Sequence, residues 1–153
     1  MKIKDCMKRN VYTIQSKATL GEAAQVFVEK HIGLLPVLDD NRKPIGVLGL
    51  RDMITLTLPS FVNLVEDVDF VHDFGAVENA RPSPEVLARQ VNSLMRPAPI
   101  VSEDDGLIRA IALMYQRRLH DLPVVNQAGQ LVGIVSRVDL GTAILRSWQN
   151  GEA

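Results

Sequence analysis

The chain has 153 residues, and its 17 lysines and arginines against 18 aspartates and glutamates leave a net charge of −1 at pH 7. This balance argues against a nucleic-acid-binding protein, which normally carries a basic patch or a strongly basic domain. Charged residues interrupt every apolar run before it reaches the roughly 18–20 residues that a membrane-spanning helix needs. No apolar run follows Lys2 and Lys4, so we expect no signal peptide. The single cysteine, Cys6, excludes an intrachain disulfide and fits a reducing compartment, so we expect a cytoplasmic protein with no membrane or nucleic-acid partner.

The first 58 residues predict a short unit of alternating strands and helices. After Thr19, apolar side chains recur at helical spacing and Glu22 is placed to complete a capping box, which predicts a helix over residues 19–31. A short extended piece at 11–14 precedes this helix. The elements expected after it are a buried strand at 34–38, a polar turn at 39–43, a strand at 45–48 and a second helix from Asp52.

A middle segment, residues 59–92, has no counterpart elsewhere in the chain. Its apolar and acidic residues alternate at helical spacing, which predicts an amphipathic helix. A solvated helix face is the favoured interpretation of the acidic stripe, ahead of a cation or partner site, and the apolar stripe packs either on the rest of the chain or on a second chain. Ser83 and Pro84 then predict a further helix that runs to Met95. The apolar positions of the expected amphipathic helix are Phe61, Leu64, Val65, Val68 and Val71. The acidic residues of this stretch are Glu66, Asp67, Asp69, Asp73 and Glu78.

The remainder of the chain repeats the first unit in the same order. We expect an extended piece at 99–102, a helix at 106–119, a strand at 122–125, a turn at 126–130, a strand at 131–135 and a helix at 138–148. Three anchors recur after 87 positions, namely Pro36 as Pro123, Gly46 as Gly133 and Asp52 as Asp139. A duplicated strand-helix-strand-strand-helix unit usually places its copies face to face about a pseudo-two-fold axis. We therefore expect a mixed α/β (α+β) fold with its sites in the clefts between the copies.

The strand-to-helix junction of the second copy has the residues of a ligand site. Ser136 and Asp139 lie three positions apart where the last strand passes into the last helix. A helix amino terminus offers unpaired backbone N–H groups and a partial positive charge, which suit a phosphate. The Ser136 hydroxyl adds a donor and the Asp139 carboxylate can accept two hydrogen bonds from a ribose diol, so adenosine phosphates would satisfy both. The alternative is that Ser136 only caps the helix and Asp139 only favours its dipole.

The ordered, repeated motifs resemble those of the tandem cystathionine-β-synthase (CBS) domain pair. The resemblance spans residues 7–58 and 95–148 and includes Met7 and Met95, which lead into the two copies. It implies two small sheets with helices, commonly dimerised into a flat disc, that act as a regulatory module. It also implies AMP, ADP, ATP or S-adenosylmethionine as a regulatory ligand, with no required cofactor. The implied domains are a first repeat at 1–58, an inter-repeat helical insert at 59–94 and a second repeat at 95–153.

The family's nucleotide motif is Gly, then Ser or Thr three positions later, then Asp three positions after that. The second copy matches it in full, whereas in the first copy Gly49 stands where the hydroxyl residue belongs. The resemblance therefore ranks the cleft of the second copy as the better nucleotide site. By position it assigns to the better site Gly133, Ser136, Arg137, Asp139, His120, Asp121, Leu122 and Thr13, and to the weaker site Asp52, Gly33, Leu34, Val101 and Ser102.

Asp121 departs from the family pattern, because some members have a basic residue at this position and a carboxylate repels phosphate. Arg137 or Arg118 could compensate for this repulsion. A ligand with little negative charge, such as S-adenosylmethionine or adenosine, stays open.

Three classes of function follow, in decreasing order of support. The first is a regulatory module without catalysis that binds an adenosyl ligand, forms a homodimer and acts on an unidentified downstream protein. The second is a ligand-independent interaction scaffold with vestigial clefts, whose working surfaces would be residues 61–71 and the stripe of Leu140, Ile144 and Trp148. An enzyme is least supported, because the chain has no P-loop, no nucleophile elbow and no His/Cys cluster at metal-ligand spacing.

Overall fold

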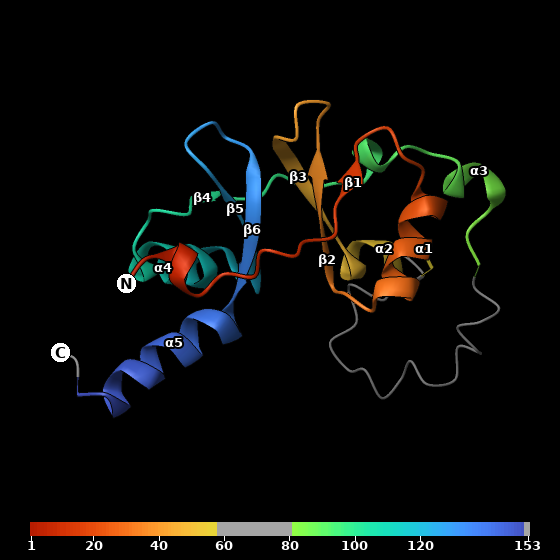
Figure 1. Cartoon of the computed structure of the whole chain (residues 1–153). Helices are drawn as coiled ribbons and strands as arrows, with labels where there is room; N and C mark the ends of the chain where they lie inside the picture. Colours follow the sequence, from red (N-terminus) through yellow and green to blue (C-terminus); the bar gives the residue numbers. More distant parts are fainter. Residues whose placement is uncertain (58–80, 152–153) are drawn as a thin grey trace, which may run out of the picture.

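The computed structural model describes residues 1–57 and 81–151, which form two similar halves that lie side by side (Figure 1). The expected order of elements is confirmed in both copies, with bounds that differ by one to three residues at most ends. The first half contains β1 (Ile14–Gln15), α1 (Leu20–Lys30), β2 (Leu34–Leu38), β3 (Pro44–Gly49) and α2 (Leu50–Ile54). The second half contains β4 (Val101–Ser102), α4 (Leu107–Arg117), β5 (Asp121–Val125), β6 (Leu131–Ser136) and α5 (Arg137–Gln149).

Each half is built on a three-stranded sheet with the same topology and register. β1 pairs parallel to β2, which pairs antiparallel to β3, and β4, β5 and β6 repeat this arrangement. Ile14 lies opposite Val37, and its counterpart Val101 lies opposite Val124. Even the irregularity in the antiparallel pair recurs, between Val37 and Leu38 and again between Val124 and Val125. The duplication seen in the sequence is therefore a duplication of backbone structure.

The capping box at the start of α1 is confirmed. The Thr19 hydroxyl oxygen accepts a hydrogen bond from the Glu22 backbone N–H at 3.1 Å, and the Glu22 carboxylate accepts one from the Thr19 N–H at 3.0 Å. These contacts satisfy two backbone groups that the first turn of a helix leaves unpaired. Leu20, Ala23 and Phe27 then face the core at helical spacing.

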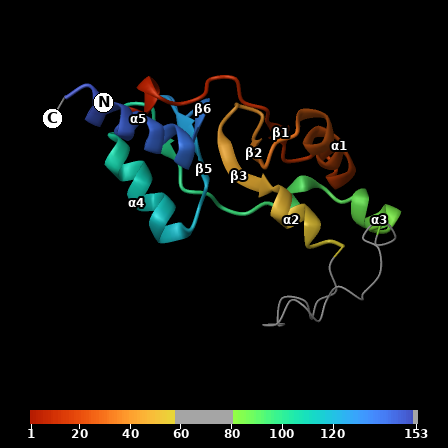
Figure 2. The ribbon, with the colours of Figure 1, turned by 90° about the horizontal axis from the view of Figure 1, so that it is seen from below.

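The two segments that lead into the copies are exchanged between them. We call residues 1–8 the first leader and residues 89–96 the second leader. The first leader precedes the first copy, yet Ile3 and Met7 are buried in the core of the second copy. The second leader correspondingly places Val91 and Met95 against the core of the first copy. Figures 1 and 2 show the first leader beside β6 and α5, and the α3 region beside the first half.

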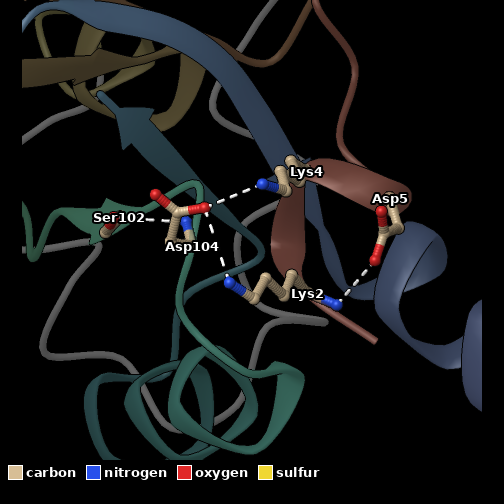
Figure 3. A network of polar contacts seen from close by, with 5 residues as sticks. All are labelled: Lys2, Lys4, Asp5, Ser102 and Asp104. Carbon is tan, nitrogen blue, oxygen red and sulfur yellow. Dashed lines mark hydrogen bonds and ion pairs between the residues drawn. The ribbon is translucent and has the colours of Figure 1, made fainter. Parts of the chain in front are cut away.

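Backbone and charged contacts hold the first leader in place. The Ile3 and Lys4 N–H groups donate to the carbonyl oxygens of Asp105 and Glu103, both at 3.0 Å. Figure 3 shows the Asp104 carboxylate between two lysines, with Lys4 Nζ at 2.9 Å and Lys2 Nζ at 3.7 Å. The hydrogen bond to Lys4 holds the pKa of Asp104 below its usual range, and the same bond raises the pKa of Lys4. The pair is exposed, so the buried apolar residues of the leader contribute more to its anchoring than this ion pair does.

The helix expected from Pro84 to Met95 is shorter than predicted. Ser83 does cap it, since its hydroxyl accepts from the Val86 N–H at 3.3 Å, but α3 spans only Pro84–Leu87. The chain becomes extended at Gln90 and forms a 3-10 turn at Val91–Ser93. The reason is tertiary: the Val91 N–H must donate to the Ala18 carbonyl at 2.7 Å while its side chain enters the first core. The amphipathic helix expected around residues 61–71 lies outside the described residues.

Two glycines permit the leaders to cross the opposite sheets. A β-carbon at Gly133 would lie 2.7 Å from Met7 Sδ and 2.8 Å from the Lys8 carbonyl oxygen. A β-carbon at Gly46 would lie 2.9 Å from the Arg96 carbonyl oxygen. Both leaders also form a backbone bridge at this point, Lys8 with Ile134 and Arg96 with Val47. The repeated glycines are therefore needed for close approach, with no requirement for an unusual backbone angle.

We predict that Gly133→Ala lowers the free energy of unfolding by about 1–3 kcal/mol, because the added methyl group forces the first leader away from β6. The matched control is Gly141→Ala in α5, where a β-carbon meets no atom within 4 Å. That change should raise stability by up to about 1 kcal/mol through helix propensity. Urea denaturation of both variants checks the pair, and equal stabilities for Gly133→Ala and the wild type would contradict the close-approach argument.

Candidate functional site

The structure brings Ser136 and Asp139 together at the amino terminus of α5, as the sequence indicates. The Ser136 Oγ accepts from the Asp139 N–H at 3.0 Å, and Asp139 Oδ2 accepts from the Ser136 N–H at 2.9 Å. The other carboxylate oxygen of Asp139 lies 3.9 Å from Lys8 Nζ, and its side chain is 14% exposed. One carboxylate oxygen is thus committed to capping, and the other faces a basic group from the first leader.

The equivalent junction of the first copy is more fully occupied. Asp52 Oδ2 accepts from the Gly49 N–H at 2.8 Å, while Oδ1 lies 2.9 Å from Arg96 Nε. The helix α2 therefore begins at Leu50, two residues earlier than predicted, because Asp52 caps it from its third position. Asp52 has the same capping role as Asp139, but here a guanidinium contacts the second carboxylate oxygen directly.

Two hollows lie between the copies and are related by the repeat. We name them after the leader residue that lines each one. The Lys8 cleft has a volume of about 320 Å³ and is lined by Lys8, Asn10, Val11, Tyr12, Ile32, Gly33, Leu34, Asp121 and Ile134. The Arg96 cleft has a volume of about 600 Å³ and is lined by Gly33, Leu34, Val47, Gly49, Arg51, Arg96, Ala98, Arg117, Arg118, Leu119, His120 and Asp121.

The conserved register of the copies assigns each motif to one cleft. Ser136 and Asp139 border the Lys8 cleft without lining it, since Ser136 pairs with the lining residue Asp121 and Asp139 Oδ1 lies 3.9 Å from Lys8 Nζ. Asp139 itself lines a neighbouring hollow of about 380 Å³ with Cys6 and Met7. Gly49 lines the Arg96 cleft, and Asp52 adjoins it through Arg96. Each cleft is therefore lined by residues of both copies and of one leader.

Several predicted site residues lie elsewhere than the sequence grouping places them. His120, which the sequence groups with Ser136, lines the Arg96 cleft, and its carbonyl oxygen accepts from the Arg137 N–H of α5 at 3.0 Å. Arg137 instead lines a smaller hollow with His120 and Arg118. Leu122 and Val101 are core residues, 0% and 1% exposed, because they point inward from their strands.

The remaining predicted residues lie at the clefts or beside them. Gly33, Leu34 and Asp121 line both clefts, whereas the sequence groups Gly33 and Leu34 with the weaker site and Asp121 with the better one. Thr13 directly follows Tyr12 of the Lys8 cleft. Ser102 lies in β4, where its N–H donates to the Asp105 carboxylate at 2.9 Å.

Sequence reasoning missed three arginines that line the Arg96 cleft. Arg51 comes from α2, Arg96 from the second leader and Arg117 from the end of α4. One signal was present in the sequence, since Arg96 follows Met95 as Lys8 follows Met7. Because Met7 and Met95 are anchored on the opposite sheets, the basic residue after each one is brought to a cleft.

The titratable groups at the clefts have unequal surroundings. Burial raises the pKa of the Asp121 carboxyl, and Asp139 adds to this rise, whereas His120, Lys8 and Arg137 oppose it. Burial also raises the pKa of the Cys6 thiol, so Cys6 is protonated at neutral pH and is a poor nucleophile. Among residues 1–57 and 81–151, no three His, Cys, Asp or Glu side chains gather as a metal site.

Comparison with known proteins assigns the family. The CBS-domain profile matches residues 3–58 and 89–146, which is most of the chain. The chain belongs to the CBS-domain family. In this CBS pair, no helix of the described part of the chain is long and apolar enough to cross a membrane.

Relatives of this CBS pair support the same assignment. It is 30% identical over 146 residues to the chloroplastic CBS domain-containing protein CBSX2 of Arabidopsis thaliana. The match covers 91% of this chain and 60% of the length of CBSX2. The crystal structure of CBSX2 in complex with AMP has a TM-score of 0.70 and 26% identity, covering 95% of this chain and 96% of the other. The CBS domain pair of MJ0100, in complex with 5′-methylthioadenosine and S-adenosyl-L-methionine, shares the fold with a TM-score of 0.68 at 18% identity, covering 96% of this chain and 98% of the other.

We predict that Asp121→Asn raises the free energy of unfolding at pH 7. A raised pKa means that the folded protein holds this proton more tightly than the unfolded chain does, so wild-type stability falls as pH rises through the folded pKa. The amide removes that loss, and the gain should vanish below the ordinary Asp pKa of 3.8.

Urea denaturation at neutral pH and at increasingly acidic pH checks this sign. Asp40→Asn, in an exposed turn, is the control and should leave stability within about 0.5 kcal/mol at pH 7. An Asp121→Asn variant that is less stable than the wild type at pH 7 would show that the carboxylate is held favourably by its basic neighbours.

Proposed function

We propose that this CBS pair is a regulatory module that binds an adenosine-containing ligand between its copies and has no catalysis of its own. The observation that carries the proposal is the capped junction at Ser136 and Asp139, which adjoins a cleft of about 320 Å³. That volume is within the range of small-molecule sites. The crystal structure of CBSX2 with AMP supports an adenosyl ligand for this chain.

Three groups at this junction suit an adenosine phosphate. The α5 amino terminus provides a partial positive charge that favours a phosphate, while the Arg137 and Asp139 N–H groups already donate to the His120 carbonyl oxygen and to Ser136 Oγ. The Ser136 hydroxyl can donate to the same phosphate while its oxygen keeps the capping bond from Asp139 N–H. Asp139 Oδ1 lies 3.9 Å from an exposed lysine, too far for a close hydrogen bond, so it can accept from a ribose hydroxyl. AMP, ADP, ATP and S-adenosylmethionine all carry this ribose.

Regulation would follow from the composition of the clefts. Each cleft takes residues from both copies, so a ligand that binds one relative arrangement more tightly stabilises that arrangement. A downstream protein that reads this state would be a separate partner, and no cofactor is required. The lone, protonated Cys6 and the CBS resemblance support a non-catalytic module in a reducing compartment such as the cytoplasm.

We further propose a homodimer, which an apolar surface on α4 and α5 supports. Tyr115 and Ile108 on α4 are 81% and 77% exposed, and Val138 and Trp148 on α5 are both 71% exposed. The spacing of seven between Ile108 and Tyr115 places them on one helix face. A two-fold axis would bring the same surface of two chains together and bury these side chains on both. The alternative function, a ligand-independent interaction scaffold, would use the same surface. Of the stripe expected for it, Leu140 is buried in the core and Ile144 packs against the core, so Trp148 alone is strongly exposed.

We predict that AMP at 100 times its dissociation constant raises the melting temperature by several degrees, since one-site binding then adds about 2.7 kcal/mol. Asp139→Ala should reduce this shift more than Asp52→Ala, because Arg96 already occupies the second oxygen of Asp52. The measurement is a thermal-shift comparison of AMP, ADP, ATP and S-adenosylmethionine, with each variant referred to its own ligand-free melting temperature.

Asp105→Asn is the matched control for that experiment. Its carboxylate also accepts a backbone N–H three residues earlier, at 2.9 Å from Ser102, but it does not line either cleft. It should keep the full ligand-induced shift. The absence of any shift with all four ligands would favour the interaction scaffold.

We predict that Trp148→Glu converts a dimer into a monomer, because it places a charge in the apolar surface of α5 at a side chain that is 71% exposed. Sedimentation equilibrium of the full chain measures this. Ile45→Glu on β3, where Ile45 is 42% exposed, is the control and should leave the dimer intact. A wild-type chain that is monomeric at all concentrations would refute the proposed homodimer.

A further inference from the structure

The two clefts share one backbone design but differ strongly in charge. The Arg96 cleft has four guanidinium groups and the His120 imidazole against the single carboxylate of Asp121 among its lining residues. The Lys8 cleft has one ammonium group, Lys8, against the same carboxylate. Each cleft has a basic leader residue, Lys8 or Arg96, but the additional arginines line the Arg96 cleft only.

The repeat shows where this charge was gained. The counterpart of Arg51 in the second copy, 87 positions later, is Val138. The counterparts of Arg118 and His120 in the first copy are His31 and Gly33. Arg117 differs from these three, because its counterpart Lys30 is also basic and lies 5.1 Å from the ring of Tyr12, which lines the Lys8 cleft. The substitutions at the other three positions add basic groups at the Arg96 cleft only. A solvated surface would not need them all at one hollow, whereas recognition of a multiply charged anion would.

Asp121 increases the difference in charge between the two clefts, because its carboxylate lines both of them. It repels a negative ligand on either side. At the Lys8 cleft a single ammonium opposes that repulsion, and Lys8 Nζ is also 3.9 Å from Asp139. At the Arg96 cleft four arginines oppose it. Among the residues that the structure describes, a carboxylate pairs with Arg96 but with none of Arg51, Arg117 and Arg118.

From this charge distribution we infer that the Arg96 cleft binds the phosphate chain of a nucleoside di- or triphosphate, and that the Lys8 cleft takes an adenosyl ligand of low negative charge. The inference rests on the proposed function for the adenosine part of each ligand. It reverses the phosphate ranking drawn from the missing hydroxyl at Gly49, since guanidinium groups replace the lost donor. Arg51 and Arg118 are the specificity-determining residues, because they have no basic equivalent of comparable strength at the other cleft.

The test compares ATP, AMP and inorganic tripolyphosphate by titration calorimetry on the full chain. The test variant is Arg51→Gln with Arg118→Gln, two exposed side chains whose change leaves the core untouched. The control variant is Arg42→Gln with Arg89→Gln, which removes the same charge at exposed positions outside both clefts. For the wild type we expect one ATP molecule to bind per chain, with an affinity at least about tenfold higher than that for AMP.

In the test variant, affinity for ATP and for tripolyphosphate should fall about tenfold or more, while affinity for AMP changes less than about threefold. The control variant should match the wild type, apart from a small uniform loss that 0.3 M salt removes. If ATP binds no more tightly than AMP, or if the test variant weakens both equally, the inference is wrong.

The same titrations separate this inference from the proposed function. Tripolyphosphate binding that the test variant abolishes, together with no binding of AMP, adenosine or S-adenosylmethionine, would support the phosphate site and refute an adenosyl sensor. Binding of AMP that depends on Asp139, together with no selective loss of ATP in the test variant, would support the sensor and overturn the assignment of the Arg96 cleft.

Discussion

The exchange of leaders between the two copies is the constraint on which the rest of the structure depends. Each copy lacks part of its own core and receives it from the segment that precedes the other copy, through Ile3 and Met7 on one side and Val91 and Met95 on the other. The exchange requires the backbone of a leader to touch a strand of the opposite sheet, and a glycine at that point is the residue that allows it. Neither copy can therefore complete its core alone, and the fixed relation of the copies is a consequence of core packing.

The clefts are a direct result of the same crossing. Met7 and Met95 are anchored against Gly133 and Gly46, and the next residue of each leader, Lys8 or Arg96, is thereby placed opposite an aspartate that caps a helix. The basic leader residue at each cleft and the aspartate that faces it thus belong to different copies. A shift of one copy relative to the other would change these contacts first, which gives a ligand in a cleft a physical means of sensing or fixing that arrangement.

The sequence predicted the parts of this structure that depend on local pattern. Strand and helix order, the Thr19 capping box and the junction at Ser136 and Asp139 were all evident from spacing. The leader exchange was not, because a segment with two or three apolar residues contains no information about which core it joins. The same limit explains the overlong helix predicted after Pro84, since its end is decided by contacts between distant segments. Residues that line a cleft from three separate elements, such as Arg51 and Arg117, become neighbours only when those contacts are known.

The ion pair between Arg96 and Asp52 gives the Arg96 cleft a property that its counterpart lacks. Arg96 is 51% exposed, so an anion can reach its guanidinium, whereas Asp52 is only 13% exposed and needs a new donor once Arg96 leaves it. Displacement leaves Asp52 Oδ1 without its partner while Oδ2 still caps α2. A ribose hydroxyl could then replace the guanidinium as the donor to Oδ1. Phosphate and ribose recognition would reinforce each other at this cleft, whereas at the Lys8 cleft the longer 3.9 Å contact leaves Asp139 available before any ligand arrives.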